Sequence, residues 1–149
     1  GQAIRLYDTL TQEILANQIR YVSPVSYTWT QDSQKLLFAS TNCSVNTNNR
    51  CSVSIRTVFD RSKPPLDAPR DYYFDVPIDF ELGTFAAFPS LFWSPNGKWL
   101  ATLAEGNMQL WDIERKMKVS LSRNVQNMNW SPDGEKFILL LDSGKAKVI

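Results

Sequence analysis

The chain contains no histidine, and it offers few groups that could do chemistry. Histidine is the commonest general base and a frequent metal ligand, so its absence removes the usual catalytic and metal sites. Asp75 and Asp79 lie close together in sequence, but no other reactive group accompanies them. No glycine-rich phosphate loop and no Gly-x-Ser-x-Gly motif is present. The sequence therefore predicts a protein that is not an enzyme, with no catalytic, cofactor-binding or metal-binding residues.

Cys43 and Cys51 are the only cysteines, and they flank a short polar segment rich in asparagine. If two antiparallel strands meet at this segment, the cysteines lie opposite each other at a spacing that suits a disulfide bond. Such a bond would order the tip and indicate an oxidising, extracytoplasmic compartment, periplasmic or secreted. The alternative is a pair of reduced thiols in a cytosolic loop; the sequence favours the disulfide.

Three stretches of the chain, residues 29–38, 93–102 and 130–139, are variants of one another. Each begins with tryptophan, passes through a tight polar turn and continues as an apolar strand. In residues 94–97, Ser-Pro-Asn-Gly, proline presets the second turn position and glycine takes the left-handed fourth position. Residues 131–134, Ser-Pro-Asp-Gly, repeat this chemistry. The first copy has neither proline nor glycine, and it predicts a looser turn.

Short stretches that alternate apolar and polar residues lie between these turns. Residues 4–8 and 108–112 both end in an aromatic residue followed by aspartate, and each leads into a turn and a second short strand. Period-two alternation indicates a strand with one buried face, so the repeating unit is four strands. Between Trp29 and Trp93 the unit carries a proline-rich insertion, in which residues 71–76 are predicted to form the closing strand.

These repeats resemble the β-propeller repeats of the WD40 and TolB-like groups. The resemblance rests on Trp-Ser-Pro-Asp/Asn-Gly, on the apolar strand that follows it, and on Leu-Trp-Asp at residues 110–112. It implies an all-β fold made of four-stranded antiparallel blades. WD40 repeats commonly carry a histidine that supports the Trp-Asp pair; this chain has none, which favours a divergent or TolB-like propeller.

The repeats predict one domain of successive blades. We expect a partial blade over residues 1–20, a blade over 21–90 with an insertion at about 60–89, a blade over 91–122 and a partial blade over 123–149. Closed propellers need at least about four blades, because fewer leave long sheet edges unpaired. The expected structure is an incomplete ring, either part of a larger propeller or a subunit covered by other chains. A small, strongly twisted closed sandwich is the alternative.

Tryptophan recurs at one position of the repeat, as Trp29, Trp93 and Trp130. A large apolar ring that returns at a fixed structural position predicts packing between blades rather than ligand contact.

Four other aromatic residues are candidate partner-binding residues. Trp99 occupies a position that is lysine in the other two copies, so it is a candidate exposed anchor. Its alternative role is to cover a neighbouring blade. Tyr72, Tyr73 and Phe74 in the insertion are similar candidates, with packing of the closing strand as the alternative.

The 16 basic and 15 acidic residues leave a net charge of +1, so no strong field attracts nucleic acid or an anionic membrane. No apolar run is long enough to span a membrane. The pattern favours a scaffold that presents loops to a protein partner or to other subunits of an assembly. Two alternatives stay open: an accessory propeller of a larger, peptidase-like enzyme, and a structural subunit of a cell-surface assembly.

Overall fold

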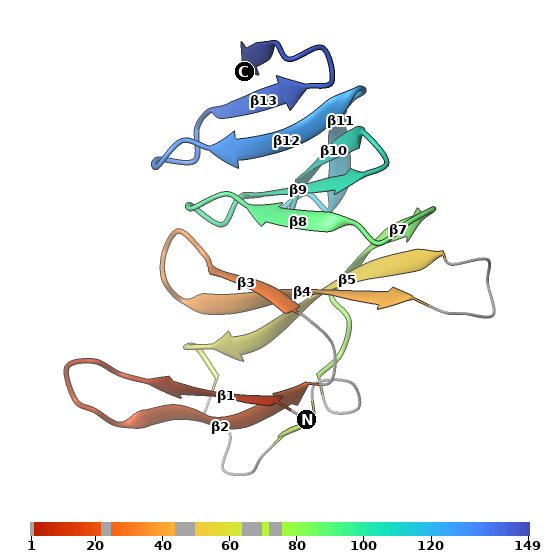
Figure 1. Cartoon of the computed structure of the whole chain (residues 1–149). Coiled ribbons are helices and arrows are strands. Elements are labelled where there is room, and N and C mark those ends of the chain that lie inside the picture. The colour runs from red at the N-terminus through yellow and green to blue at the C-terminus, as the bar shows by residue number, and fades with distance from the viewer. Residues whose placement is uncertain (1, 22–24, 44–49, 64–69, 72–75) are drawn as a thin grey trace.

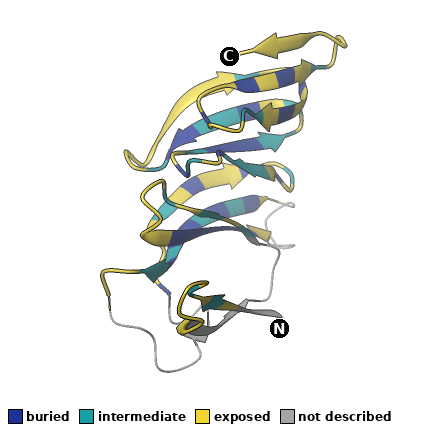
Figure 2. Ribbon diagram, turned by 90° about the vertical axis from the view of Figure 1, so that its left-hand side faces the viewer, coloured by how far each residue is buried: buried dark blue, intermediate teal, exposed yellow. Residues whose placement is uncertain are grey.

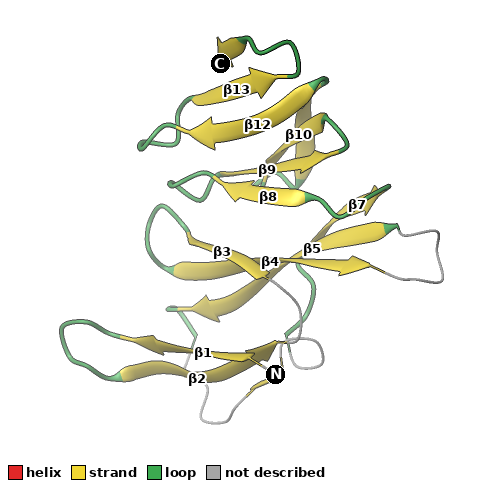
Figure 3. Cartoon of the chain, in the orientation of Figure 1, coloured by secondary structure: helices red, strands yellow, loops and turns green. Residues whose placement is uncertain are grey.

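The computed structural model describes residues 2–21, 25–43, 50–63, 70–71 and 76–149. In this part of the chain every regular element is a β-strand (Figure 3). The strands form four sheets stacked in chain order, with the N-terminal and C-terminal sheets at opposite ends of the stack (Figure 1). We call these sheets the first to the fourth blade. The arrangement confirms the predicted all-β fold of antiparallel blades in an incomplete ring.

In the described part of the chain, two blades have four strands and two have three. The first blade contains β1 (Gln2–Tyr7), β2 (Ile14–Tyr21) and β6 (Arg70–Asp71). The second contains β3 (Val25–Trp29), β4 (Lys35–Cys43), β5 (Cys51–Asp60) and β7 (Phe80–Phe85). The third contains β8 (Ser90–Trp93), β9 (Trp99–Ala104), β10 (Asn107–Asp112) and β11 (Met117–Ser122). The fourth contains β12 (Val125–Trp130), β13 (Phe137–Leu141) and β14 (Ala146–Val148).

The strand that closes the second blade is β7, and the prediction of residues 71–76 for this role is wrong. β7 pairs antiparallel with β5, and its Leu82 and Phe85 are buried in the core between the second and third blades. Gly83, with a φ of +99°, lies at a bulge in this pairing and allows both side chains to reach that core. The aromatic run has the stronger local strand signal, but β7 completes the blade and buries Leu82 and Phe85.

The insertion reaches back to the first blade. Residues 70–71 form β6, which pairs in parallel with β2 at Ile19 and Arg20. The next residues, 72–75, lie outside the described residues. The insertion in the second blade therefore contributes a strand to the edge of the first.

Apolar cores join each blade to the next. Leu100 of β9 faces the second blade, and the following residue, Ala101, faces the fourth. On β10, Trp111 joins the core with the second blade and Met108 joins the core with the fourth. A similar core joins the first blade to the second. Because both faces of the third blade are covered, its inner strand β9 is buried at three successive positions, Leu100, Ala101 and Thr102 (Figure 2).

The turns that follow β3, β8 and β12 share one hydrogen-bond pattern. In the second blade, the hydroxyl of Thr30 donates to Asp32 Oδ1 at 2.6 Å and accepts the backbone N–H of Lys35 at 3.0 Å. The corresponding side chains of the third and fourth blades make the same bonds: Ser94 with Asn96, and Ser131 with Asp133. The prediction of a looser first turn is wrong, because Ser33 adopts the left-handed conformation, with a φ of +58°, in place of glycine.

Two glycines allow these turns to approach one another. Gly97 and Gly134 have φ values of +70° and +72°. A Cβ atom at Gly97 would overlap the carbonyl oxygen of Trp29, and one at Gly134 would lie 2.8 Å from the side chain of Asn96. The amide of Asn96 also donates to the carbonyl oxygen of Asp133 at 3.3 Å. The turns therefore form a column along one side of the stack (Figure 1).

Candidate binding surface

Cys43 and Cys51 form a disulfide bond at the tip of the β4–β5 hairpin, which confirms the predicted pairing. The two residues lie directly opposite each other in the antiparallel register, with their Cα atoms 4.0 Å apart. Cys51 is buried and pairs with Phe85 of β7, whereas Cys43 is exposed. The bond therefore ties the tip to the core of the second blade.

The recurring tryptophans pack between blades in two of the three copies. Trp130 donates its indole N–H to the carbonyl oxygen of Phe92 in the third blade, at 3.0 Å. Trp93 packs against the core between the second and third blades, and its buried indole N–H has no hydrogen-bond partner in the described part of the chain. Trp29 is 38% exposed and contacts Phe59 of its own blade. The first blade, as described, has no strand in the corresponding position for Trp29 to contact.

Of the four predicted partner-binding aromatics, Trp99 lies within the described residues. Trp99 is half-buried at the start of β9. Since side chains alternate along a strand, it shares the face of Ala101, which looks toward the fourth blade. Tyr72, Tyr73 and Phe74 lie outside the described residues. A binding role for these residues stays a prediction.

A cavity of about 670 Å³ opens between the second and third blades, beside the column of turns. Its walls are the turn after β3, the turn after β8, the turn between β10 and β11, and the start of β7. Leu37 and Ile55 supply apolar lining from β4 and β5, together with Phe80 of β7. We call this the inter-blade cavity. All its walls are segments that the sheets hold in place.

Several polar groups of the inter-blade cavity are fixed by their own contacts. Lys35 forms an ion pair with Asp60 at 3.8 Å, and Lys116 donates to the backbone oxygen of Asp79 at 3.3 Å. The carboxylate of Asp79 in turn accepts the backbone N–H of Thr57. These contacts hold charged groups of both signs at defined places along the walls.

The carboxylate of Asp32 is also held in the wall. The hydrogen bond from the Thr30 hydroxyl, followed by that from the Gln34 backbone N–H, keeps the pKa of Asp32 below its ordinary value. Asp32 therefore stays ionised at neutral pH. Lys98 and Glu114 are exposed and form no ion pair within the described residues. Both side chains are therefore available to pair with charges on a ligand.

The inter-blade cavity was not predicted from the sequence. It joins residues far apart in the chain, such as Lys35, Asp79 and Lys98. In the sequence, each of them taken alone is a charged residue of the kind usually found on a solvated surface. One signal was available: equivalent turns of neighbouring blades lie side by side, so the repeats place the turn at Asp32 next to the turn at Asn96. Asp79 lies in the insertion, and no local sequence pattern predicts that it lines the cavity.

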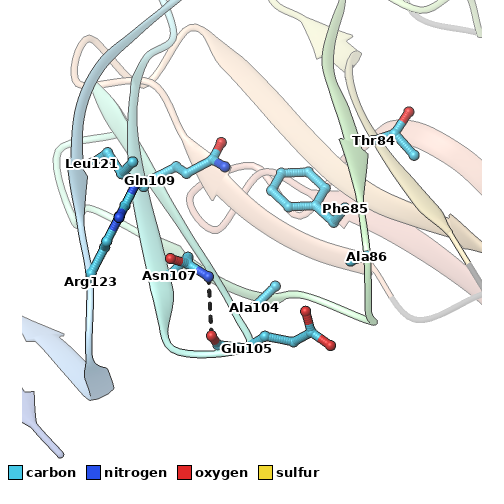
Figure 4. A pocket seen from close by; sticks show the side chains of 9 residues that line it. All are labelled: Thr84, Phe85, Ala86, Ala104, Glu105, Asn107, Gln109, Leu121 and Arg123. Carbon is cyan, nitrogen blue, oxygen red and sulfur yellow. Dashed lines mark hydrogen bonds between the residues drawn. The ribbon is translucent and has the colours of Figure 1, made fainter.

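A smaller hollow, of about 320 Å³, lies at the opposite end of the same two blades (Figure 4). Phe85 and Leu121 give it apolar walls, and Gln109 and Arg123 add polar groups. The side-chain amide of Asn107 donates to the backbone oxygen of Glu105 at 3.1 Å, within the β9–β10 turn. This hollow lies near the disulfide-bonded tip, because Phe85 pairs with Cys51.

The described residues contain no cluster of three or more acidic or cysteine side chains that could hold a metal ion. No helix long and apolar enough to cross a membrane occurs among them.

No protein-family model matches the chain, and no curated protein matches it. The Cps50 (Swd1) β-propeller domain of Myceliophteria thermophila is a similar solved structure, with a TM-score of 0.50 and 14% identity over 98% of this chain and 44% of that one. A functionally unknown protein from Desulfotomaculum acetoxidans has a TM-score of 0.49 and 14% identity, over 97% of this chain and 46% of that one.

Hsv2 of Kluyveromyces lactis has a TM-score of 0.39 and 11% identity, over 99% of this chain and 55% of that one. The chain therefore spans about half of the length of these structures, or less. Together with the stacked antiparallel sheets, the likeness to the Swd1 β-propeller domain establishes the fold: the chain is an incomplete ring of β-propeller blades.

Proposed function

We propose that this chain is a non-enzymatic scaffold whose inter-blade cavity receives a segment of a protein partner. The observation that carries the proposal is the cavity itself, a concave space walled by turns from two rigid blades. Its volume of about 670 Å³ lies within the range of roughly 300–1,000 Å³ that is usual for binding pockets. Recognition by loops that a rigid framework positions is the common arrangement in binding domains.

The lining favours a polypeptide ligand with both charged and apolar side chains. Phe80 and Ile113 are partly exposed and offer apolar contact, and Lys98 and Glu114 offer one charge of each sign at the rim. Because hydrogen bonds within the turns hold the walls, binding requires little ordering of the site. A protein segment supplies apolar groups and charges of both signs on one ligand.

The disulfide bond supports an oxidising compartment for this activity, so the proposal includes a periplasmic or secreted location. Thiol titration of the denatured, unreduced protein isolated from its native source should find no free sulfhydryl. Two reactive thiols would instead indicate a reducing compartment.

The binding proposal is tested with peptides selected on the whole chain from a displayed random library. We expect Lys98→Glu to weaken binding of the selected peptides at least about tenfold, since it reverses a charge at the rim of the inter-blade cavity. Arg123→Glu is the matched control, because it makes the same charge change at the smaller hollow. Failure to select any peptide, or equal losses in both variants, would contradict a site in the inter-blade cavity.

A further inference from the structure

The outermost strand of the third blade has an open side. β11 stands last in the strand order β11-β10-β9-β8, and it pairs with β10 on one side. Its other side makes no backbone hydrogen bond to any part of the chain that the structure describes. Backbone N–H and C=O groups along such an edge are a template for a further strand. We call residues 120–123, at the end of β11, the open edge.

The corresponding strand of the first blade carries an added strand. β1 and β10 both end beside an aromatic residue followed by aspartate, and each pairs with the strand that comes after it. β2 and β11 are therefore equivalent strands. β6 pairs in parallel with β2, on the side away from β1. Because β6 comes from the insertion, the first blade receives this strand from outside its own repeat.

The pairing register places the open edge at the position that β6 occupies on the first blade. The residue three places before the aromatic residue pairs with Ile19 in the first blade and with Ser122 in the third. Ser122 therefore corresponds to Ile19, and Arg123 corresponds to Arg20. β6 pairs with β2 at Ile19 and Arg20. The open edge is thus equivalent to the segment at which the first blade accepts its added strand.

The open edge also has a regular register. Its strand residues, 120–122, pair with β10 without a shift, and the irregularity in this pairing lies before them, at Val119. The outermost strand of the second blade, β7, instead has the bulge at Gly83. Since bulges discourage strand addition at an edge, the third blade is better suited to receive a strand than the second.

The residues of the open edge define what an added strand should carry. Arg123 is exposed and forms no ion pair within the described residues. In the first blade, the register partner of the equivalent Arg20 is an aspartate, Asp71 of β6. Leu121 is 47% exposed and lies with Arg123 at the rim of the smaller hollow (Figure 4). An added strand should therefore have an acidic residue opposite Arg123 and an apolar residue opposite Leu121, two positions earlier.

We propose that the open edge binds an extended segment of a protein partner, which adds to β11 as a parallel strand and places a carboxylate opposite Arg123. Main-chain hydrogen bonds to the edge supply affinity, and the two side-chain positions supply specificity. None of residues 120–123 lines the inter-blade cavity, so this surface is a second one and does not depend on a ligand in that cavity.

A synthetic heptapeptide, acetyl-Thr-Val-Thr-Val-Thr-Asp-Thr-amide, is the probe. It carries a carboxylate and, two positions earlier, an apolar side chain. Titration into the whole chain should show saturable binding, and hydrogen exchange of the β11 backbone amides should slow in the complex. The same peptide with an N-methylated backbone cannot donate to the edge, and it should not bind. Equal binding of the two peptides, protection of a different strand, or no binding at millimolar concentration would overturn the proposal.

Charge exchange between the two partners tests the register. Arg123→Glu should weaken binding of the heptapeptide about fivefold or more, and a peptide with lysine in place of aspartate should restore it. Arg61→Glu is the matched control, since Arg61 is exposed in the turn after β5 and lines neither the inter-blade cavity nor the smaller hollow. It should leave binding unchanged. Failure of the lysine peptide to restore binding would overturn the pairing with Arg123.

Circular dichroism checks that the variants fold. If Arg123→Glu does not fold, the lysine peptide is measured on the wild-type chain, where it should bind more weakly than the aspartate peptide by a similar factor. Equal affinities of the two peptides there would overturn the pairing.

Other occupants of the open edge, and another site for the peptide, would give different results. Protection of the β11 amides that rises with the concentration of the chain alone would show that a second copy occupies the edge, and would overturn the proposal. Loss of heptapeptide binding in Lys98→Glu would place the peptide in the inter-blade cavity, and would also overturn it. The two binding surfaces can therefore fail separately, because each is tested by its own peptides and its own variant.

Discussion

The turns of the second and third blades make the same hydrogen bonds from different sequences. The second has Thr-Gln-Asp-Ser at residues 30–33, and the third has Ser-Pro-Asn-Gly at residues 94–97. In both, a hydroxyl at the first position bonds the side chain at the third and the backbone across the turn. These shared side chains therefore set the shape of the turn, and proline and glycine are not required for it.

What differs is the neighbour of each turn. Gly97 lies against the backbone of Trp29 in the preceding blade, where no Cβ atom fits. Ser33 occupies the same turn position in the second blade, and the first blade, as described, has no such turn beneath it. Glycine is thus needed where two turns stack, and a side chain is tolerated at the end of the column.

Gly97→Ala should have the largest effect on stability. Two costs add: the left-handed conformation, about 1–2 kcal/mol for a residue with a Cβ, and displacement of the Trp29 backbone, about 1–3 kcal/mol as in overpacked cores. The measurement is the free energy of unfolding in urea.

Gly144→Ala is the control for Gly97→Ala. Gly144 has a φ of +77°, but a Cβ atom there would meet nothing within 4 Å. The loss of stability in Gly144→Ala should therefore be limited to the conformational cost of about 1–2 kcal/mol. Equal losses in the two variants would show that stacking of the turns is not the reason for glycine at position 97.

Features fixed by local chemistry could be predicted from the sequence. The turn residues, the alternating strands and the Cys43–Cys51 pair are each encoded within a few consecutive positions, and the structure has them. The closing strand β7 and the inter-blade cavity depend on contacts between distant residues. The choice of β7 over residues 71–76 was decided by burial of Leu82 and Phe85 against the third blade, which no local pattern shows.

The indole hydrogen bond gives a second difference between neighbouring blades. Trp130→Phe removes the bond to Phe92, whereas Trp93→Phe removes a buried N–H that has no partner among the described residues. Since both changes remove the same ring area, the Trp130 variant should be less stable by about 1 kcal/mol. Thermal unfolding of the two variants side by side measures this. A greater loss for Trp93→Phe would contradict the assigned bond.

Ser33→Gly should stabilise the protein by a smaller amount. Glycine relieves the cost of the left-handed conformation at this position. It also raises the conformational entropy of the unfolded chain, which lowers stability by about 0.5–1 kcal/mol. The net gain should be about 0.5–1 kcal/mol in the free energy of unfolding. No gain, or a loss, would show that the Ser33 side chain contributes contacts of its own.

The smallest expected effect is a change in acid sensitivity, and it compares an aspartate turn with an asparagine turn. The Ser131 hydroxyl, followed by the backbone N–H of Glu135, keeps the pKa of Asp133 below its ordinary value. A lowered folded-state pKa contributes stability that is present above the unfolded-state pKa and is lost as pH falls through the folded one. Asn96 shows that an amide can make the same turn bonds without a charge.

Asp133→Asn should therefore be slightly less stable than the wild type at pH 7, and this difference should shrink as the pH falls below about 4, the ordinary range of an aspartate pKa. The reason is that the wild-type carboxylate becomes protonated and loses its charge-assisted bonds, whereas the amide is unchanged. Urea unfolding midpoints of both proteins between pH 7 and pH 2.5 give the comparison. Parallel pH profiles would mean that ionisation of Asp133 contributes nothing to the turn, and that asparagine and aspartate are equivalent at this position of the repeat.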